Sequence, residues 1–295
     1  MPMLTAPGTI KAYFALFAGL LIIGFSAILI KSAEAPGMVT AFYRVGIASL
    51  VLFFPLLSHW KKLTQLSTKA LLMPILGGIA FGIDTGLWSW GIEISNATIP
   101  TLMANLAPVW VGLGALLIFK EKQRWGFWLG LLIAISGTFL MAVQSFGASD
   151  GLFEGIIISL IAGIFYGIYH LFTQQGRAMM STLLYLSISS ITAAITVGLI
   201  IVCNSNYSFT GYNNYTWIIW LIYGIGVHVG GWTLINYSQG HLKATTVSPT
   251  LLGQPVITAI AAFFILGEAL SSWQIIGGLI VISGIYLVNI TRLKR

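Results

Sequence analysis

The sequence predicts an all-α integral membrane protein of ten transmembrane helices, arranged as two inverted repeats of five. Its composition is 57% hydrophobic and 7% charged, which is too apolar for a soluble chain of 295 residues. Its apolar runs are about 20 residues long, and such runs cross lipid as helices because a helix satisfies its own backbone hydrogen bonds. One long stretch also occurs twice, so an internal repeat sets the architecture.

The repeat pairs residues 97–141 with residues 244–288 at a constant offset of 147 (255 − 108), without a gap. The matched positions include Pro108 and Pro255, Glu121 and Glu268, Gly130 and Gly277, and the Ile-Ser-Gly triplets at 135–137 and 282–284. Any two apolar helices show some identical residues by chance, because their compositions are similar. The paired prolines and glutamates and the gapless match indicate a true repeat, and we divide the chain into residues 1–145 and 146–295.

Charged residues or Gly, Pro and Asn clusters separate the apolar segments of both repeats. In the first repeat the predicted spans are 12–30, 37–58, 70–92, 97–119 and 125–143. In the second they are 152–173, 182–203, 216–237, 245–266 and 273–290. The connections are short, which leaves no room for a soluble catalytic domain or a nucleic-acid module. The single cysteine, Cys203, has no metal-ligand spacing around it, so we expect no metal site and no cofactor.

Basic residues predict the orientation of these spans. With a cytoplasmic N-terminus, the inner loops and tails hold Lys11, Lys61, Lys62, Lys69, Lys120, Lys122, Arg124, Arg177, Lys243, Arg292, Lys294 and Arg295, whereas the outer loops hold Lys31. This asymmetry follows the positive-inside rule and places both termini in the cytoplasm. The net charge of +7 therefore reflects topology, and we expect a lipid bilayer and no nucleic acid as partner.

Five spans per repeat is an odd number, so the two halves have opposite orientations in the membrane. Inverted halves related by an axis in the membrane plane offer two similar conformations, one open to each side. This architecture is typical of carriers that work by alternating access, and neither a channel nor an intramembrane enzyme needs it.

These motifs resemble the EamA-type carriers of the drug/metabolite transporter superfamily. The similarity rests on Ala107-Pro108 and Pro255, on Leu266-Gly267-Glu268 before Trp273, on Phe119-Lys120-Glu121 before Trp125, and on the Ile-Ser-Gly ends of both repeats; Gly24, Gly167 and Arg44 also match. The resemblance implies a ten-helix secondary transporter and covers nearly the whole chain. It does not imply a particular cargo, because one fold serves many cargoes.

Arg44 and Asp84 are two ionisable residues predicted within the membrane, where such side chains cost roughly 2.5–3.5 kcal/mol on insertion scales. Both lie roughly 12–14 Å below the outer surface at a rise of 1.5 Å per residue. A structural ion pair between them is one interpretation. The other is functional, with Asp84 exchanging a proton or binding a cationic substrate, and the two are compatible.

His228 lies near the middle of the eighth span, with Trp232 and Asn236 following on the same helical face. On the repeat it aligns with Phe81, one turn from Asp84, which places it near a central cavity. Its imidazole either couples transport to protons or stays neutral between helices. His170, one turn from Tyr166, is expected to be interfacial.

Pro108 and Pro255 each stand near the middle of a span, where proline removes a backbone donor and breaks the helix. Broken helices at a repeat interface indicate a transport site. Polar side chains precede both prolines: Thr101, Asn105, Ser248, Thr250 and Gln254. These side chains either line the site or bond neighbouring helices. The aromatic side chains that the resemblance places at the cavity are Trp88, Trp110, Tyr166, Tyr169, Trp232 and Tyr237.

We therefore predict a secondary active transporter for a small organic metabolite in the cell inner membrane, with an amino acid or an amine first. The expected substrate-binding residues are Asp84, Trp88, Asn105, Tyr169, His228, Trp232 and Gln254. The alternative is an intramembrane enzyme or receptor that uses Asp84, His170 and His228, although no catalytic motif supports it. Proton coupling and a monomer or homodimer both stay open.

Overall fold

The computed structural model describes residues 7–95, 98–143, 152–203, 207–267 and 269–293, and the regular elements of this part of the chain are all helical. Within these residues, nine helices are long and apolar enough to cross a membrane, and the shorter apolar helix Trp125–Met141 supplies a tenth span. The predicted ten-helix membrane fold is thereby confirmed.

The first repeat forms five spans. They are α1 (Pro7–Ile23) with α2 (Ser26–Ser32), then α3 (Gly37–Ser58), α5 (Thr68–Ile94), α6 (Thr98–Ala104) with α7 (Ala107–Phe119), and α8 (Trp125–Met141). The short helix α4 (Trp60–Leu63) connects α3 to α5. Ser67 caps α5 by accepting a hydrogen bond from the Ala70 amide, which fixes where the third span begins.

The second repeat forms the other five. They are α9 (Leu152–Arg177), α10 (Thr182–Val202), α11 (Asn214–Leu221) continued by the π-helix η2 (Ile222–Gly231) and α12 (Trp232–Gln239), then α13 (Ala244–Leu251) with α14 (Gln254–Leu266), and α15 (Ser272–Leu293). The sequence predicts the eighth span as one regular helix. Its π-helical middle has wider turns than an α-helix, and such segments are often found at functional sites.

Three spans are broken near their middle. The breaks lie at residues 24–25, 105–106 and 252–253. Pro108 and Pro255 stand in the first turns of α7 and α14, where a missing amide donor costs no hydrogen bond. The break between α1 and α2 has no proline; there, a Cβ on Gly24 would collide with the Ile257 side chain of α14. Close packing against the second repeat accompanies this break.

The fifth and tenth spans pack against each other through glycines. A Cβ on Gly130 would lie 2.9 Å from the carbonyl oxygen of Gly284, and one on Gly137 would lie 2.7 Å from that of Gly277. In the repeat, Gly130 corresponds to Gly277 and Gly137 corresponds to Gly284. Exchanging the two repeats therefore turns the contact of Gly130 with Gly284 into the contact of Gly277 with Gly137. This reciprocal pattern is what a two-fold axis between antiparallel helices produces. The halves are thus inverted.

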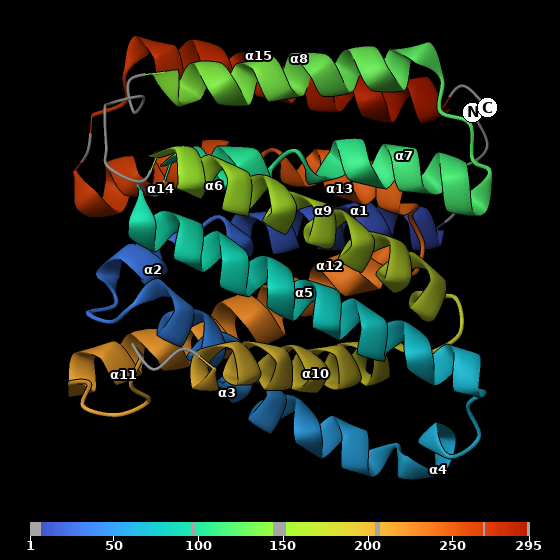
Figure 1. Cartoon of the computed structure of the whole chain (residues 1–295). Helices are drawn as coiled ribbons and strands as arrows, with labels where there is room; N and C mark the ends of the chain where they lie inside the picture. The colour runs from blue at the N-terminus through green and yellow to red at the C-terminus, as the bar shows by residue number, and fades with distance from the viewer. Residues whose placement is uncertain (1–6, 96–97, 144–151, 204–206, 268, 294–295) are drawn as a thin grey trace.

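Figure 1 shows α8 and α15 as a pair along one side of the molecule, with α3, α4, α10 and α11 on the opposite side. The start of α1 and the end of α15 lie at one end of the bundle, the end of the termini, and α2 and α11 lie at the other (Figure 1). The main hydrophobic core fills the interior of the bundle with large buried side chains such as Leu52, Tyr185 and Tyr223. Phe14 and Leu117 are 74% and 77% exposed, as expected for side chains that face lipid.

Candidate functional site

The three helix breaks meet at a small cavity in the interior, which we call the inner cavity. Its volume is about 60 Å³. The residues that line it are Ile23, Ser26, Arg44, Phe81, Asp84, Thr85, Trp88, Thr101, Ala104, Asn105, Tyr166, Trp232 and Gln254. Both repeats contribute, since α9, α12 and α14 supply the last three.

Helix α5 presents one face to this cavity. Phe81, Asp84 and Trp88 follow one another at intervals of three and four residues, so they lie on one side of the helix. All three are at least nine-tenths buried. The Trp88 indole donates a hydrogen bond of 3.2 Å to the Thr101 hydroxyl, which ties α5 to α6 beside its break. The Asp84 carboxyl is therefore held on a rigid helix.

Arg44 enters the cavity from α3. Its Nη1 donates a hydrogen bond of 3.0 Å to the Tyr223 hydroxyl, and its guanidinium carbon lies 4.8 Å from the Tyr223 ring centre and 5.4 Å from that of Phe81. Among the described residues, the ion pairs within 4.0 Å do not include Arg44 with Asp84. The predicted ion pair is therefore absent from this conformation. Two aromatic rings hold the guanidinium by cation–π contact instead.

His228 lies behind the cavity wall, not in it. Its Nε2 lies 2.9 Å from the Ser190 hydroxyl, and its ring is packed 5.6 Å from that of Phe81. The predicted cavity position for His228 is thus wrong for this conformation, although Trp232 does line the cavity. The physical reason is a partner on α10: the Ser190 hydroxyl holds the imidazole, whose ring centre stays 6.4 Å from that of Trp232.

Tyr169 also stands in this second layer. Its hydroxyl accepts a hydrogen bond of 3.0 Å from the Asn236 amide, and its ring packs 4.8 Å from Phe81. His170 is fully buried, 3.0 Å from the Gln239 side-chain amide, so the expectation of an interfacial histidine is wrong. Tyr169 therefore supports Phe81, and through it the cavity, without lining it.

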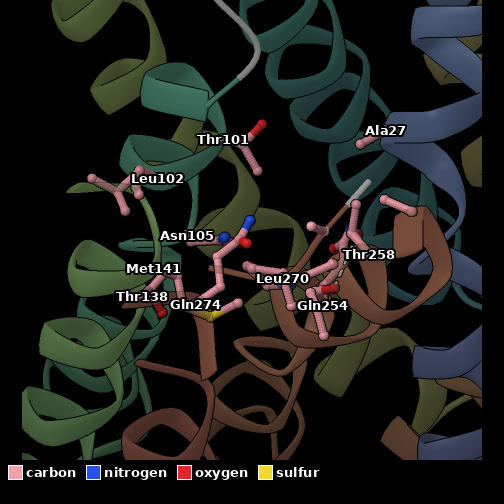
Figure 2. Close-up of a pocket in the computed structure, with 15 residues that line it drawn as sticks. Ala27, Thr101, Leu102, Asn105, Thr138, Met141, Gln254, Thr258, Leu270 and Gln274 are labelled. Atoms are coloured by element: carbon pink, nitrogen blue, oxygen red, sulfur yellow. Dashed lines mark hydrogen bonds between the residues drawn. The ribbon is translucent and has the colours of Figure 1, made fainter. Parts of the chain in front are cut away.

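A second, larger cavity of about 250 Å³ adjoins the first, and we call it the outer cavity. It shares Thr101, Asn105 and Gln254 with the inner cavity. Its other lining residues are Ala27, Leu102, Thr138, Met141, Ala142, Pro255, Thr258, Ala259, Ala262, Ala269, Leu270 and Gln274. Figure 2 shows side chains of α6 and α8 on one side of it and Gln254 and Thr258 of α14 on the other.

A third cavity of about 240 Å³, the vestibule, shares Ala27 and Thr101 with the outer cavity. Lys31 and Glu93 give it one side chain of each charge. The Glu93 carboxylate accepts a hydrogen bond of 3.1 Å from the Tyr207 hydroxyl. Partial burial and the nearby carboxylate raise the pKa of Tyr207 to about 12, so this phenol stays a hydrogen-bond donor at neutral pH. The three cavities extend toward the end of the bundle opposite the chain termini.

Interactions between helices close the end that carries the termini. The Lys243 ammonium lies 2.9 Å from the Glu121 carboxylate and joins the start of α13 to the loop after α7. The Arg177 Nε donates a hydrogen bond of 3.0 Å to the Asn236 carbonyl, and the Gln174 side chain accepts one from the Ala244 amide. The ion pair ties the second repeat to the first, and the two hydrogen bonds join helices within the second repeat.

Five of the seven predicted substrate-binding residues line the inner cavity, namely Asp84, Trp88, Asn105, Trp232 and Gln254. Their binding of a substrate stays a prediction. Apart from Gln254 and Pro255, the sequence does not predict the outer-cavity residues of α8, α14 and α15. Small and aliphatic side chains in a membrane helix carry no chemical signal that separates a cavity wall from ordinary packing. Tyr166 and Thr101 could be found, because an aromatic or hydroxyl side chain near a break is unusual enough to notice.

The comparison with protein families decides the relationship. The model of the EamA-like transporter family matches residues 10–143 and again residues 153–290. This chain belongs to the EamA-like transporter family. The two EamA matches fall on the two inverted halves, and the protein is accordingly a multi-pass membrane transporter for small metabolites.

Curated EamA relatives are distant and have different cargoes. An S-adenosylmethionine uptake transporter of Rickettsia prowazekii is 22% identical over 82% of this chain and 79% of its own length. The riboflavin transporter ImpX of Fusobacterium nucleatum is 25% identical over 69% of each chain. A probable terminal-alkyne amino-acid exporter of Streptantibioticus cattleyicolor is 24% identical over 71% of this chain and 69% of its own.

A solved structure titled "Crystal structure of protein" has the same fold. It superposes with a TM-score of 0.78 at 14% identity and covers 96% of this chain and 98% of its own. The named relatives are all transporters, so they give the enzyme alternative no support.

Proposed function

We propose that this EamA protein is a secondary active transporter that moves a small organic metabolite by alternating access, with an amino acid or an amine as the first candidate. The observation that carries the proposal is the meeting of three broken helices at one buried cavity that holds a carboxylate, a guanidinium and two amides. Broken helices that meet at the repeat interface are the usual substrate site of inverted-repeat carriers.

The closed and open ends support alternating access. The cavities extend toward one end of the bundle, while the Lys243–Glu121 ion pair and the hydrogen bonds of Arg177 close the other. Because the repeats are inverted, exchanging their conformations would open the end that is closed here. With both termini in the cytoplasm, as the basic residues indicate, the cavities face outward in this conformation.

The side chains of the inner cavity favour a charged amphipathic cargo. Asp84 would bind an ammonium group, and the indoles of Trp88 and Trp232 offer faces on which a cation or an apolar group stacks. The cargo names of the relatives, which include S-adenosylmethionine and an amino acid, support an organic metabolite of this size. Proton exchange at Asp84 is the proposed drive, since its buried carboxyl would alternate between a proton and the cargo.

Flux into proteoliposomes tests the proposal. Purified protein is reconstituted and offered radiolabelled L-amino acids and amines, with and without a pH gradient. We expect uptake of at least one of them, and we expect Trp232→Ala and Asp84→Asn to reduce it to the level of empty vesicles while the protein still folds. Trp125→Ala is the matched control, since the Trp125 side chain is 79% exposed and faces lipid.

Two results would count against the proposal. One is normal uptake by both inner-cavity variants, which would place the cargo elsewhere. The other is saturable binding without flux in either direction, which would favour the receptor alternative.

A further inference from the structure

The two connected cavities differ in size, which indicates that they bind different parts of the cargo. The inner cavity has a volume of about 60 Å³, which is room for a small polar group. It accommodates the charged head of a metabolite and not the whole molecule. The outer cavity is about four times as large, at about 250 Å³, and shares Thr101, Asn105 and Gln254 with it. A cargo seated by its head therefore extends into the outer cavity.

The inner cavity offers groups for both charges of a zwitterion. Asp84 supplies a carboxylate, whereas Arg44 supplies a fixed positive charge. Among the described residues, Arg44 Nε, Asn105 Nδ2 and Trp232 Nε1 are buried donors without a hydrogen-bond partner. Buried donors that lack a partner cost stability, and an anionic group that accepts from them would remove that cost. A head with an ammonium and a carboxylate satisfies both sets.

The outer cavity has different walls. Leu102, Met141 and Leu270 make its surface largely aliphatic, and alanines such as Ala259 and Ala262 leave the space that larger side chains would fill. Figure 2 shows Met141 and Leu102 on the side of α8 and α6, with Leu270 nearer to Gln254. Such a surface gains from burying apolar groups, and its polar side chains, among them Thr138, Thr258 and Gln274, carry no charge to pair with an ionic group.

We propose that the outer cavity is a side-group pocket, and that the cargo is a zwitterion whose charged head lies in the inner cavity and whose branched or aromatic side group lies in the outer one. This inference rests on the proposed transport function and adds to it the division of the site. The shared side chains Asn105 and Gln254 mark the boundary between head and side group.

The test compares probes that differ in one part only. Binding of glycine, L-leucine, L-phenylalanine, L-leucinamide and N-acetyl-L-leucine is measured by thermal shift on the purified full chain. We expect L-leucine and L-phenylalanine to bind, glycine to bind more weakly, and the two derivatives that lack one charge to lose binding. Equal affinity for glycine and L-phenylalanine would overturn the side-group pocket. Absence of binding by all five probes would overturn the zwitterionic cargo.

Variants then address the pocket itself. Ala262→Leu fills the outer cavity and should weaken L-phenylalanine binding by about tenfold or more while glycine binding changes less than twofold. Ala269→Trp, at an exposed position on the cavity wall, tests the same point without crowding the interior. Ser283→Leu is the matched control, because Ser283 is exposed on α15 and is not part of either cavity wall.

Either of two variant results would overturn the pocket: an equal loss for glycine and L-phenylalanine, or no change for any probe in both Ala262→Leu and Ala269→Trp. Binding with the expected preference but without flux in proteoliposomes would leave the pocket in place and refute transport.

Discussion

A methyl group added at Gly277 would collide with the backbone of α8. Its Cβ would lie 2.6 Å from the Gly137 carbonyl oxygen and 2.8 Å from the Met141 amide nitrogen. The next residue, Gly278, provides a matched control in the same helix, because its Cβ would lie 3.7 Å from the Val256 side chain, an ordinary van der Waals distance. The two Gly→Ala changes are chemically identical and differ only in what the methyl group meets.

The expected magnitude follows from these distances. To bring 2.6 Å to the 3.4 Å of ordinary contact, α15 must move away from α8 by about 0.8 Å, since backbone atoms cannot rotate aside. Overpacking of this kind costs about 1–3 kcal/mol. Alanine also gains roughly 0.5–1 kcal/mol over glycine within a helix, and this gain is common to both variants. The difference between the variants is therefore about 1–3 kcal/mol in favour of Gly278→Ala.

The assay is the melting temperature of the purified protein in detergent. At roughly 2–4 °C per kcal/mol, Gly277→Ala should melt about 2–12 °C below Gly278→Ala. Gly137→Ala, which meets Gly277 at 2.7 Å, should behave like Gly277→Ala. The double variant should lose less than the sum, because one separation of the two helices accommodates both methyl groups. Equal melting of Gly277→Ala and Gly278→Ala would refute the close packing of α8 and α15.

Two further predictions concern the two ends of the bundle. The Lys243–Glu121 pair contributes at most about 1 kcal/mol, since the Lys243 side chain is 49% exposed. Lys243→Ala should therefore raise the labelling rate of a cysteine placed between this pair and the inner cavity by up to about fivefold. The charge swap Lys243→Glu with Glu121→Lys should restore the slow rate, and failure to do so would deny the pair a role in closing this end. In a Cys203→Ser background, a cysteine at Asn213 should react with a membrane-impermeant thiol reagent on intact cells and one at Thr64 should not; the reverse pattern would overturn the charge-based orientation.

The partners of Arg44, Asp84 and His228 are features that the sequence does not specify. The common depth of Arg44 and Asp84 was correctly read as a shared location, since both line the inner cavity. The predicted direct contact between Arg44 and Asp84 is wrong for this conformation, because the Arg44 guanidinium donates its hydrogen bond to Tyr223, which is far along the chain. His228 lies outside the cavity with its imidazole against Ser190 of α10, a partner that the repeat alignment does not indicate.

The sequence by itself determined the ten membrane spans, the inverted repeat and the family. Lipid contains no water to satisfy backbone groups, so each span must be a continuous apolar run, and such runs are visible in the sequence. Pairing Pro108 with Pro255 likewise located two of the three helix breaks to within one turn. Only the tertiary structure decided which side chains face the cavities and that the space divides into an inner and an outer part. The physical reason is that these helices are apolar on every face, so hydropathy does not encode their rotation, and packing between helices distant in sequence sets it instead.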